Sequence, residues 1–164
     1  MSARRKTGLV LAACILALAP ASAPGQEATK RTPSPPGAKV YVISPAEGER
    51  VQSPVLVRFG LSGMGVAPAS VGFPNTGHHH VLIDAELPPF DQPIPADAQH
   101  VHFGAGLTEV RLELPPGEHR LQLLLGDQAH VPHDPPVYSE PITILVVPST
   151  GDAGGAAGPE AAAP

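Results

Sequence analysis

The sequence predicts an all-β fold, an antiparallel β-sandwich of about seven strands between residues 39 and 147. Short apolar runs recur through this region, and proline or glycine separates them every 8 to 15 positions or so. No stretch of about eleven residues here keeps a 3.6-residue apolar period without a proline or glycine inside it. We therefore expect almost no helix.

The expected strands are runs of apolar or alternating residues that are bounded by turn residues. They are 39–44, 54–61, 78–84, 99–103, 107–114, 118–125 and 137–147. The clearest pair flanks the turn sequence PPGE, because each side carries an apolar triplet at alternate positions. The triplets are Val110, Leu112, Leu114 and Leu121, Leu123, Leu125. The residues between them, expected to face water, are Arg111, Glu113, Arg120 and Gln122.

Two long connections, 62–77 and 85–98, separate the predicted strands. Loops of this length in a compact domain are usually functional or mobile. Position 119, just after PPGE, is where immunoglobulin-like sandwiches place a tyrosine that bonds back across the turn. His119 is therefore expected to be structural, and the predicted sandwich is immunoglobulin-like.

Residues 1–23 have the pattern of a cleaved export signal. Three basic residues at positions 4–6 precede the apolar run GLVLAACILALAP and the small-residue motif ASA. The apolar run is about a dozen residues, shorter than the roughly 20 that a membrane-spanning helix needs. The protein is therefore expected to be periplasmic or secreted, without a transmembrane span after signal removal. An alternative is a lipoprotein cleaved before Cys14 in LAAC and anchored to a membrane.

Low-complexity segments flank the predicted domain. Residues 24–38 contain several prolines and no bulky apolar residue, so we expect a linker. Residues 148–164 have no side chain able to bury a large apolar area and are expected to form a disordered tail. The sequence thus predicts one domain, residues 39–147, between flexible ends.

Charge and cysteine content narrow the function classes. Signal removal takes three of the ten basic residues and leaves 15 acidic ones, without any basic cluster. Nucleic-acid binding is excluded because it requires clustered Lys and Arg. The single cysteine is Cys14, so the mature domain forms no disulfide and depends on its apolar core.

The eight histidines include two His-x-His pairs and one His-x-x-His. Residues two apart on a strand point the same way, so such a pair can offer both imidazoles to one ion. The candidate metal ligands are His78, His80, His100, His102, His130 and His133. His79 should instead share the opposite face with Val81 and Ile83 and pack there.

The chemistry of the candidate ligands favours zinc or copper(II). The predicted mature chain has no thiolate and only Met64 as a thioether, so the soft ligands that favour copper(I) are missing. Asp84, Asp127 and Asp134 lie near the histidines in sequence and are candidate additional ligands. The same histidines could instead form a buried hydrogen-bonded network, or bind an organic or saccharide ligand.

The sequence does not predict an enzyme. It contains no G-x-S-x-G nucleophile elbow, no H-E-x-x-H zinc motif and no glycine-rich phosphate loop after a strand. A metal-dependent hydrolase or dismutase would need an open coordination position. Two hypotheses lead: an exported metal-binding or buffering module, and an envelope or adhesion module whose histidine network braces the long loops and engages an envelope partner.

Several segments together resemble a family of exported bacterial proteins catalogued as domain of unknown function 4399. They are SPAEGERVQSPVLVRFGLSGMGVAPAS, GHHHVLID, PIPADAQHVHFGAGLTEV and LELPPGEHRLQLLLGDQAHVPHDPPVYSEPITI. The resemblance covers residues 40–147 and implies an exported, sandwich-like, non-enzymatic domain with recurrent histidine motifs. The chain departs at Leu107, where glutamine is expected, and at Gln128 and Ala129, where HN is common. The latter removes one candidate ligand.

Overall fold

The computed structural model describes residues 31–149. The predicted export signal with Cys14, the first part of the predicted linker (24–30) and nearly all of the predicted tail (150–164) lie outside these residues. Within the described part, the chain is all-β and contains no helix, so it has no helix long and apolar enough to cross a membrane. The fold class expected from the punctuated apolar runs is confirmed at this level.

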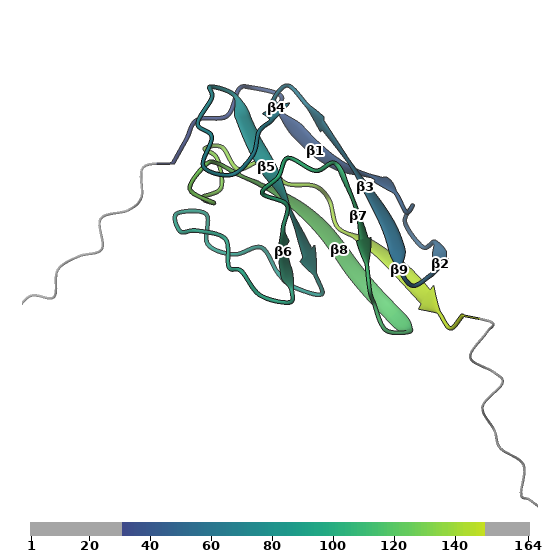
Figure 1. Ribbon diagram of the computed structural model, residues 1–164. Helices are drawn as coiled ribbons and strands as arrows, with labels where there is room; N and C mark the ends of the chain where they lie inside the picture. Colours follow the sequence, from purple (N-terminus) through teal and green to yellow (C-terminus); the bar gives the residue numbers. More distant parts are fainter. Residues whose placement is uncertain (1–30, 150–164) are drawn as a thin grey trace, which may run out of the picture.

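Nine strands form the domain (Figure 1). They are β1 (Lys39–Ser44), β2 (Arg50–Gln52), β3 (Val55–Ser62), β4 (Gly65–Val66), β5 (Thr76–Ile83), β6 (His100–His102), β7 (Glu109–Leu112), β8 (Gly117–Gly126) and β9 (Ile142–Val147). Each of the seven expected strands overlaps one of these, with ends that differ by up to five residues. The two additional strands, β2 and β4, have three and two residues, too few to produce a visible alternation.

The strands form two sheets. The smaller one has the order β1-β3-β7, and the larger has the order β2-β9-β8-β5-β4, with β6 also paired to β5. Most neighbours are antiparallel, as expected, but β2 pairs with β9 and β4 with β5 in parallel. The expectation of a purely antiparallel arrangement was wrong at these two places. At the first, Pro45 has no N–H to continue the β1 ladder, and the chain crosses to the other sheet before forming β2.

The inner faces of the two sheets share one apolar core. Alternate residues of β3 and β8 meet there, including Val57, Phe59, Leu121, Leu123 and Leu125. The predicted apolar triplets on both sides of PPGE therefore face the same core. The expectation that these two strands pair with each other was wrong, because β7 pairs with β3 in the smaller sheet and β8 pairs with β5 and β9 in the larger one. In Figure 1 the longer strands of both sheets run along the same diagonal of the view, and the short strands β6 and β7 run more steeply.

The outer face of the larger sheet is also covered, which the sequence did not predict. Leu82, Ile94 and Leu124 form a second apolar cluster, with Phe90 of the loop between β5 and β6 packed against it. Gln122 was expected to face water but is buried, because the segment before β9 covers this face. Its side-chain amide donates a hydrogen bond to the Ser139 carbonyl (2.7 Å).

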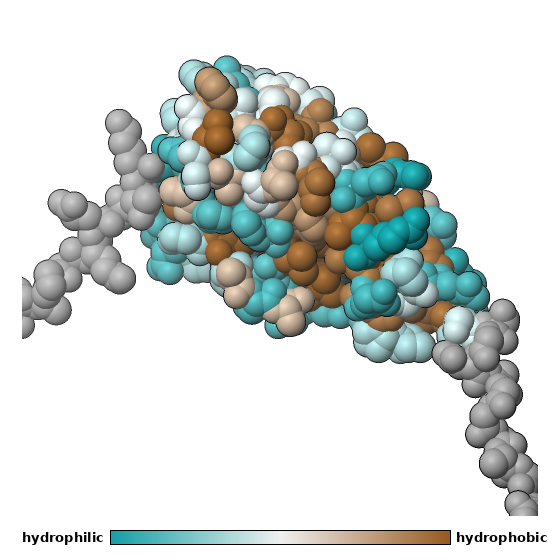
Figure 2. All heavy atoms as spheres, in the orientation of Figure 1, coloured by the Kyte–Doolittle hydropathy of each residue, from teal (hydrophilic) through white to brown (hydrophobic). Residues whose placement is uncertain are grey.

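The outer surface mixes polar and apolar side chains. On the face shown in Figure 2, hydrophilic residues border several smaller apolar areas. The exposed large apolar residues are Tyr41, Ile43, Val71, Phe73, Leu107 and Tyr138. Tyr41 and Ile43 lie on β1, Val71 and Phe73 lie in the loop between β4 and β5, and Leu107 and Tyr138 lie in two other loops.

Candidate metal centre

Strand β5 divides the three consecutive histidines between its two faces. His78, His79 and His80 are 1%, 0% and 1% exposed. His79 points into the shared core, where its ring lies 5.1 Å from that of Phe59 and its Nδ1–H donates to the Leu107 carbonyl (3.2 Å). His78 and His80 point to the outer face. The packing role expected for His79 is confirmed.

Strand β6 brings the second His-x-His pair beside the first. The antiparallel register places His102 opposite His80 and His100 opposite Leu82. Opposite residues on one face have Cβ atoms about 4.5–5.5 Å apart, so long side chains there must meet. The His102 ring lies 5.4 Å from that of His80 and 5.2 Å from that of His78, measured between ring centroids.

His130 reaches the same place from the loop between β8 and β9. It has φ of 65°, in the left-handed region that histidine adopts rarely. The buried Asp127 carboxylate holds this loop by accepting hydrogen bonds from the N–H groups of Ala129 (2.9 Å) and Val131 (3.0 Å) on either side of His130. Its second oxygen accepts the Thr32 hydroxyl at 2.6 Å. The loop conformation is therefore fixed from both sides of His130.

The segment 31–34 lies across this loop as well. Arg31 donates to the carbonyls of Pro132 (3.1 Å) and His133, and its guanidinium pairs with the Asp134 carboxylate (3.2 Å). Residues 31–34 belong to the stretch that was expected to be a linker. In the structure they contact the loop that carries His130, and thereby support the histidine cluster.

Four imidazoles converge as a result: His78, His80, His102 and His130, here called the histidine cluster. Nε2 of His78 lies 3.1 Å from Nε2 of His80, and Nε2 of His102 lies 3.2 Å from Nε2 of His130. One ring nitrogen from each of His78, His102 and His130 lies within 4.8 Å of the others. His80 joins this trio through its contact with His78.

Burial and mutual proximity lower the pKa values of His78, His80 and His102 and so favour their neutral forms. Burial, with the nearby rings of His130 and His102, lowers the pKa of His78 to about 4. Burial and the neighbouring His78 ring lower the pKa of His80 to about 2, and burial with His130 lowers the pKa of His102. Neutral imidazoles carry a free lone pair, which is the form that binds a metal.

Two of the six predicted ligands lie outside the cluster. His100 bonds through Nδ1 to the Asp97 carboxylate at 2.8 Å. His133 is fully buried and donates from Nε2 to the Thr76 carbonyl at 3.1 Å. The structure thus brings together both histidines of the first His-x-His pair. From the second pair it adds only His102, and from the His-x-x-His motif only His130.

The three aspartates considered as extra ligands also have other partners. Asp127 holds the His130 loop and Asp134 pairs with Arg31, as described above. Asp84 accepts from the Arg120 N–H (2.7 Å) and from His119 Nδ1 (2.7 Å). Among the described residues, the candidate ligand nitrogens of the histidine cluster therefore converge without a carboxylate.

His119 has the structural role expected for it. Its Nε2–H donates back across the turn to the Pro115 carbonyl at 2.9 Å, while Nδ1 bonds to Asp84. Burial acts to lower the pKa of His119, but the hydrogen bonds to Asp84 and to the Pro115 carbonyl outweigh it and raise the pKa. Both ring nitrogens of His119 are engaged in hydrogen bonds, so neither is free to bind a metal.

A glycine that sequence reasoning missed makes room for the cluster. A Cβ at Gly126, which lies opposite His78 in the register of β5 and β8, would be 2.9 Å from Nε2 of His80. We expect Gly126→Ala to displace this ring and to lower the free energy of unfolding by about 1–3 kcal/mol. Urea unfolding measures the loss.

Gly65→Ala is the matched control for this substitution. Gly65 is also in a strand, but its added Cβ would meet only the Thr76 methyl group at 3.4 Å, an ordinary contact. We expect Gly65→Ala to leave stability nearly unchanged. Equal losses in the two variants would show that the His80 ring does not lie against Gly126.

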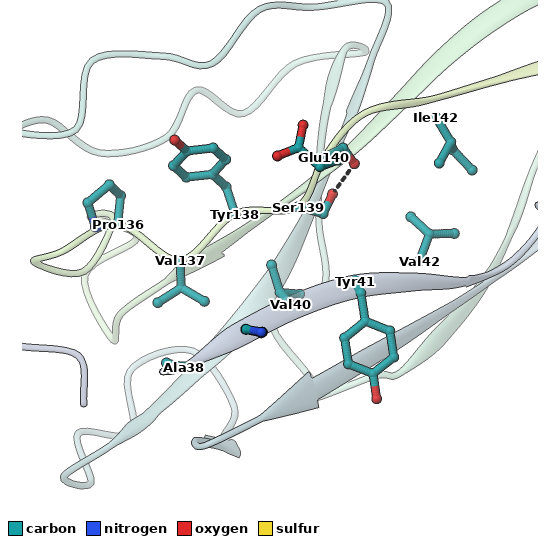
Figure 3. A pocket seen from close by; sticks show the side chains of 11 residues that line it. Ala38, Val40, Tyr41, Val42, Pro136, Val137, Tyr138, Ser139, Glu140 and Ile142 are labelled. Atoms are coloured by element: carbon teal, nitrogen blue, oxygen red, sulfur yellow. Dashed lines mark hydrogen bonds between the residues drawn. The ribbon is translucent and has the colours of Figure 1, made fainter. Parts of the chain in front are cut away.

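The cavity shown in Figure 3 has a volume of about 680 Å³. It lies away from the histidines, between β1 and the segment 136–142. The Ser139 hydroxyl, which lines it, donates to the Glu140 carbonyl (2.8 Å) and accepts from the Leu123 N–H (2.9 Å). Its lining is mainly apolar and contains no histidine. This cavity therefore lacks the imidazole groups that are the candidate metal ligands. Those groups come together in the histidine cluster instead.

Comparison with known proteins identifies the family. No curated protein matches the sequence. Among solved structures, an endo-beta-1,4-mannanase from Thermotoga petrophila matches with a TM-score of 0.40 and 19% sequence identity, over 68% of this chain and 20% of the enzyme chain. That likeness is too low to inform function, and the chain spans about a fifth of that protein's length. Residues 57–147 match the family described as Domain of unknown function (DUF4399). This match spans more than half of the 164 residues, so the chain belongs to the DUF4399 family, as its motifs predicted.

Proposed function

We propose that this domain binds one divalent transition-metal ion, zinc or copper(II), in the histidine cluster. The observation that carries the proposal is the spacing of the nitrogens. Two nitrogens about 2.0–2.1 Å from one tetrahedral ion are about 3.3–3.4 Å apart. The Nε2 atoms of His78 and His80 are 3.1 Å apart, and those of His102 and His130 are 3.2 Å apart. Each pair already has close to the separation of two ligands on one ion.

The ligand type supports the choice of metal. Neutral imidazole suits zinc and copper(II), whereas calcium and magnesium prefer oxygen ligands and copper(I) prefers thiolate or thioether. The cluster offers imidazole alone among the described residues. A site made of imidazoles is suited to binding or buffering a metal ion, and we propose that the protein is not an enzyme.

The second candidate function is structural, and the same contacts motivate it. Separations of 3.1 and 3.2 Å between ring nitrogens are also hydrogen-bond distances. In this case the network would brace the two long loops of an envelope-interaction or adhesion module. A hydrogen bond between His78 and His80 requires one ring to carry its proton on Nδ1.

The need of the buried ring nitrogens for partners does not favour the structural network over a metal ion. Nδ1 of His78 and Nδ1 of His80 are both buried without a hydrogen-bond partner among the described residues. A network leaves one buried N–H unpaired, and metal binding through Nε2 leaves two, each a cost. The network also leaves the lone pair on the remaining Nδ1 unused. The metal offsets the second unpaired N–H by using both Nε2 lone pairs in coordination bonds, which are stronger than one hydrogen bond between imidazoles.

We also propose that the domain is an exported, immunoglobulin-like sandwich that works in the periplasm or outside the cell. Support for export comes from the basic residues at positions 4–6, the apolar run and the ASA motif. A lipid anchor at Cys14 is the alternative. Support for the topology comes from the strand order, since β1-β3-β7 and β9-β8-β5 correspond to the ABE and GFC strands of that fold.

Metal content of the untagged protein tests the metal proposal against the structural network. After exposure to zinc or copper(II) and dialysis, elemental analysis should find one ion per chain. His102→Ala should lose most of the metal, whereas His100→Ala should retain it. The two histidines are on the same face of β6, but only His102 belongs to the histidine cluster. The two variants therefore differ in whether a cluster histidine is lost. A wild-type protein that retains no metal, with His102→Ala merely less stable, would favour the structural network.

A further inference from the structure

A cavity of about 260 Å³ borders the histidine cluster. One side is formed by the imidazoles of His80, His102 and His130, and the other by the segment Pro93–Ala96. This segment is tied to the cluster, because the Ile94 N–H donates to the His130 carbonyl at 2.8 Å. The loop between β5 and β6 therefore forms a wall opposite the metal-ligating nitrogens.

That wall offers no side-chain donor to a metal ion. Its residues are Pro93, Ile94, Pro95 and Ala96, which are all apolar. An ion held by the cluster would thus have protein ligands on one side and an apolar cavity on the other. Four imidazoles already fill a tetrahedral zinc site, so a ligand entering from the cavity would be a fifth one, as in the five-coordinate states that some zinc sites reach.

The charge of the site sets which ligand would fill this position. Neutral imidazoles leave a divalent ion with its full double charge, and the low-polarity wall does little to stabilise it. Asp127 is the acidic residue whose charge acts on His78, but both of its oxygens are held by Thr32 and the loop N–H groups. Asp97 is bonded to His100. An anion that entered the cavity would supply the missing charge.

We propose that the cavity admits a small monodentate anion as an exchangeable ligand of the bound metal. This inference rests on the proposed metal binding and adds an anion site to it. The anion would coordinate on the side bounded by Pro93–Ala96, with the histidines behind it.

Azide binding to the copper(II)-loaded full chain tests the anion site. Azide bound to copper(II) adds a charge-transfer absorption band, so titration gives a dissociation constant. We expect a saturable band in the wild type. In Ala96→Leu the added side chain should fill the cavity and raise the azide dissociation constant at least tenfold, while the copper content stays at one ion per chain.

Ala98→Leu is the matched control. Ala98 is two residues further along the same loop and is also exposed, but it lines a different cavity near His119. Its azide affinity should equal that of the wild type. Copper uptake without an azide band would overturn the anion site and leave the metal proposal standing. A band unaffected by Ala96→Leu would place the anion elsewhere, and failure to bind copper would overturn both proposals.

Discussion

Zinc or copper(II) is expected to raise the melting temperature of the metal-free protein by about 10 °C. A ligand that binds only the folded state stabilises it by about 2.7 kcal/mol when its free concentration is 100 times the dissociation constant. For a domain of this size, 1 kcal/mol corresponds to roughly 3–5 °C. Thermal unfolding followed by circular dichroism, with and without metal, measures the shift.

Paired substitutions locate the source of this stabilisation. His102→Ala combined with His130→Ala removes two of the converging imidazoles, so the metal-induced shift should disappear. Both side chains are less buried than His78 and His80, so the variant should still fold. His100→Ala should keep the full shift. An unchanged wild-type melting curve in excess metal would contradict the metal proposal.

Acid is expected to destabilise the metal-free domain from about pH 6.5 downward. In the unfolded chain a histidine takes up a proton near pH 6.5, whereas burial keeps the pKa of His78 at about 4 and that of His80 at about 2 in the folded state. Their contribution to stability is therefore complete above pH 6.5. It is lost as the pH falls, by about 1.4 kcal/mol per pH unit for each histidine.

Urea unfolding of the chelator-treated protein between pH 4.5 and 7.5 measures this slope. His80→Leu should reduce it by about 1.4 kcal/mol per pH unit, whereas His100→Ala should leave it unchanged. His119 has a raised pKa, so its contribution is complete below pH 6.5 and is lost only as the pH rises through the folded-state pKa. It does not offset the loss in the acidic range. A stability that is flat between pH 4.5 and 6.5 would show that His78 and His80 are not held neutral in the folded protein.

Local sequence patterns predicted most of the fold. Alternation on the two sides of PPGE placed Leu121, Leu123 and Leu125 in the core, although β7 and β8 lie in different sheets and do not pair. The same pattern could not show that the outer face of the larger sheet is covered, because Gln122 is buried by a segment more than ten residues away. The short strands β2 and β4 pair with distant partners and carry no periodic pattern of their own.

Only part of the histidine cluster could be predicted, because strand periodicity shows which face a side chain is on but not which distant residues it meets. The period of a strand placed His78 and His80 on one face and His79 on the other, as observed. Their meeting with His102 depends on the register of β5 and β6, which the sequence does not specify. The position of His130 depends on Asp127. Asp127 in turn bonds to Thr32, which lies 95 residues before it in the chain. His100 and His133 match the same motifs but bond to Asp97 and Thr76 instead.

Anomalous X-ray scattering from crystals soaked in zinc or copper(II), recorded at the metal absorption edge, is the most direct test of the metal centre. We predict one strong peak among the Nε2 atoms of His78, His80, His102 and His130, with metal–nitrogen distances of about 2.0–2.1 Å. A peak beside His100 and Asp97 instead, or no peak in the histidine cluster, would contradict the assignment of these residues as the metal site.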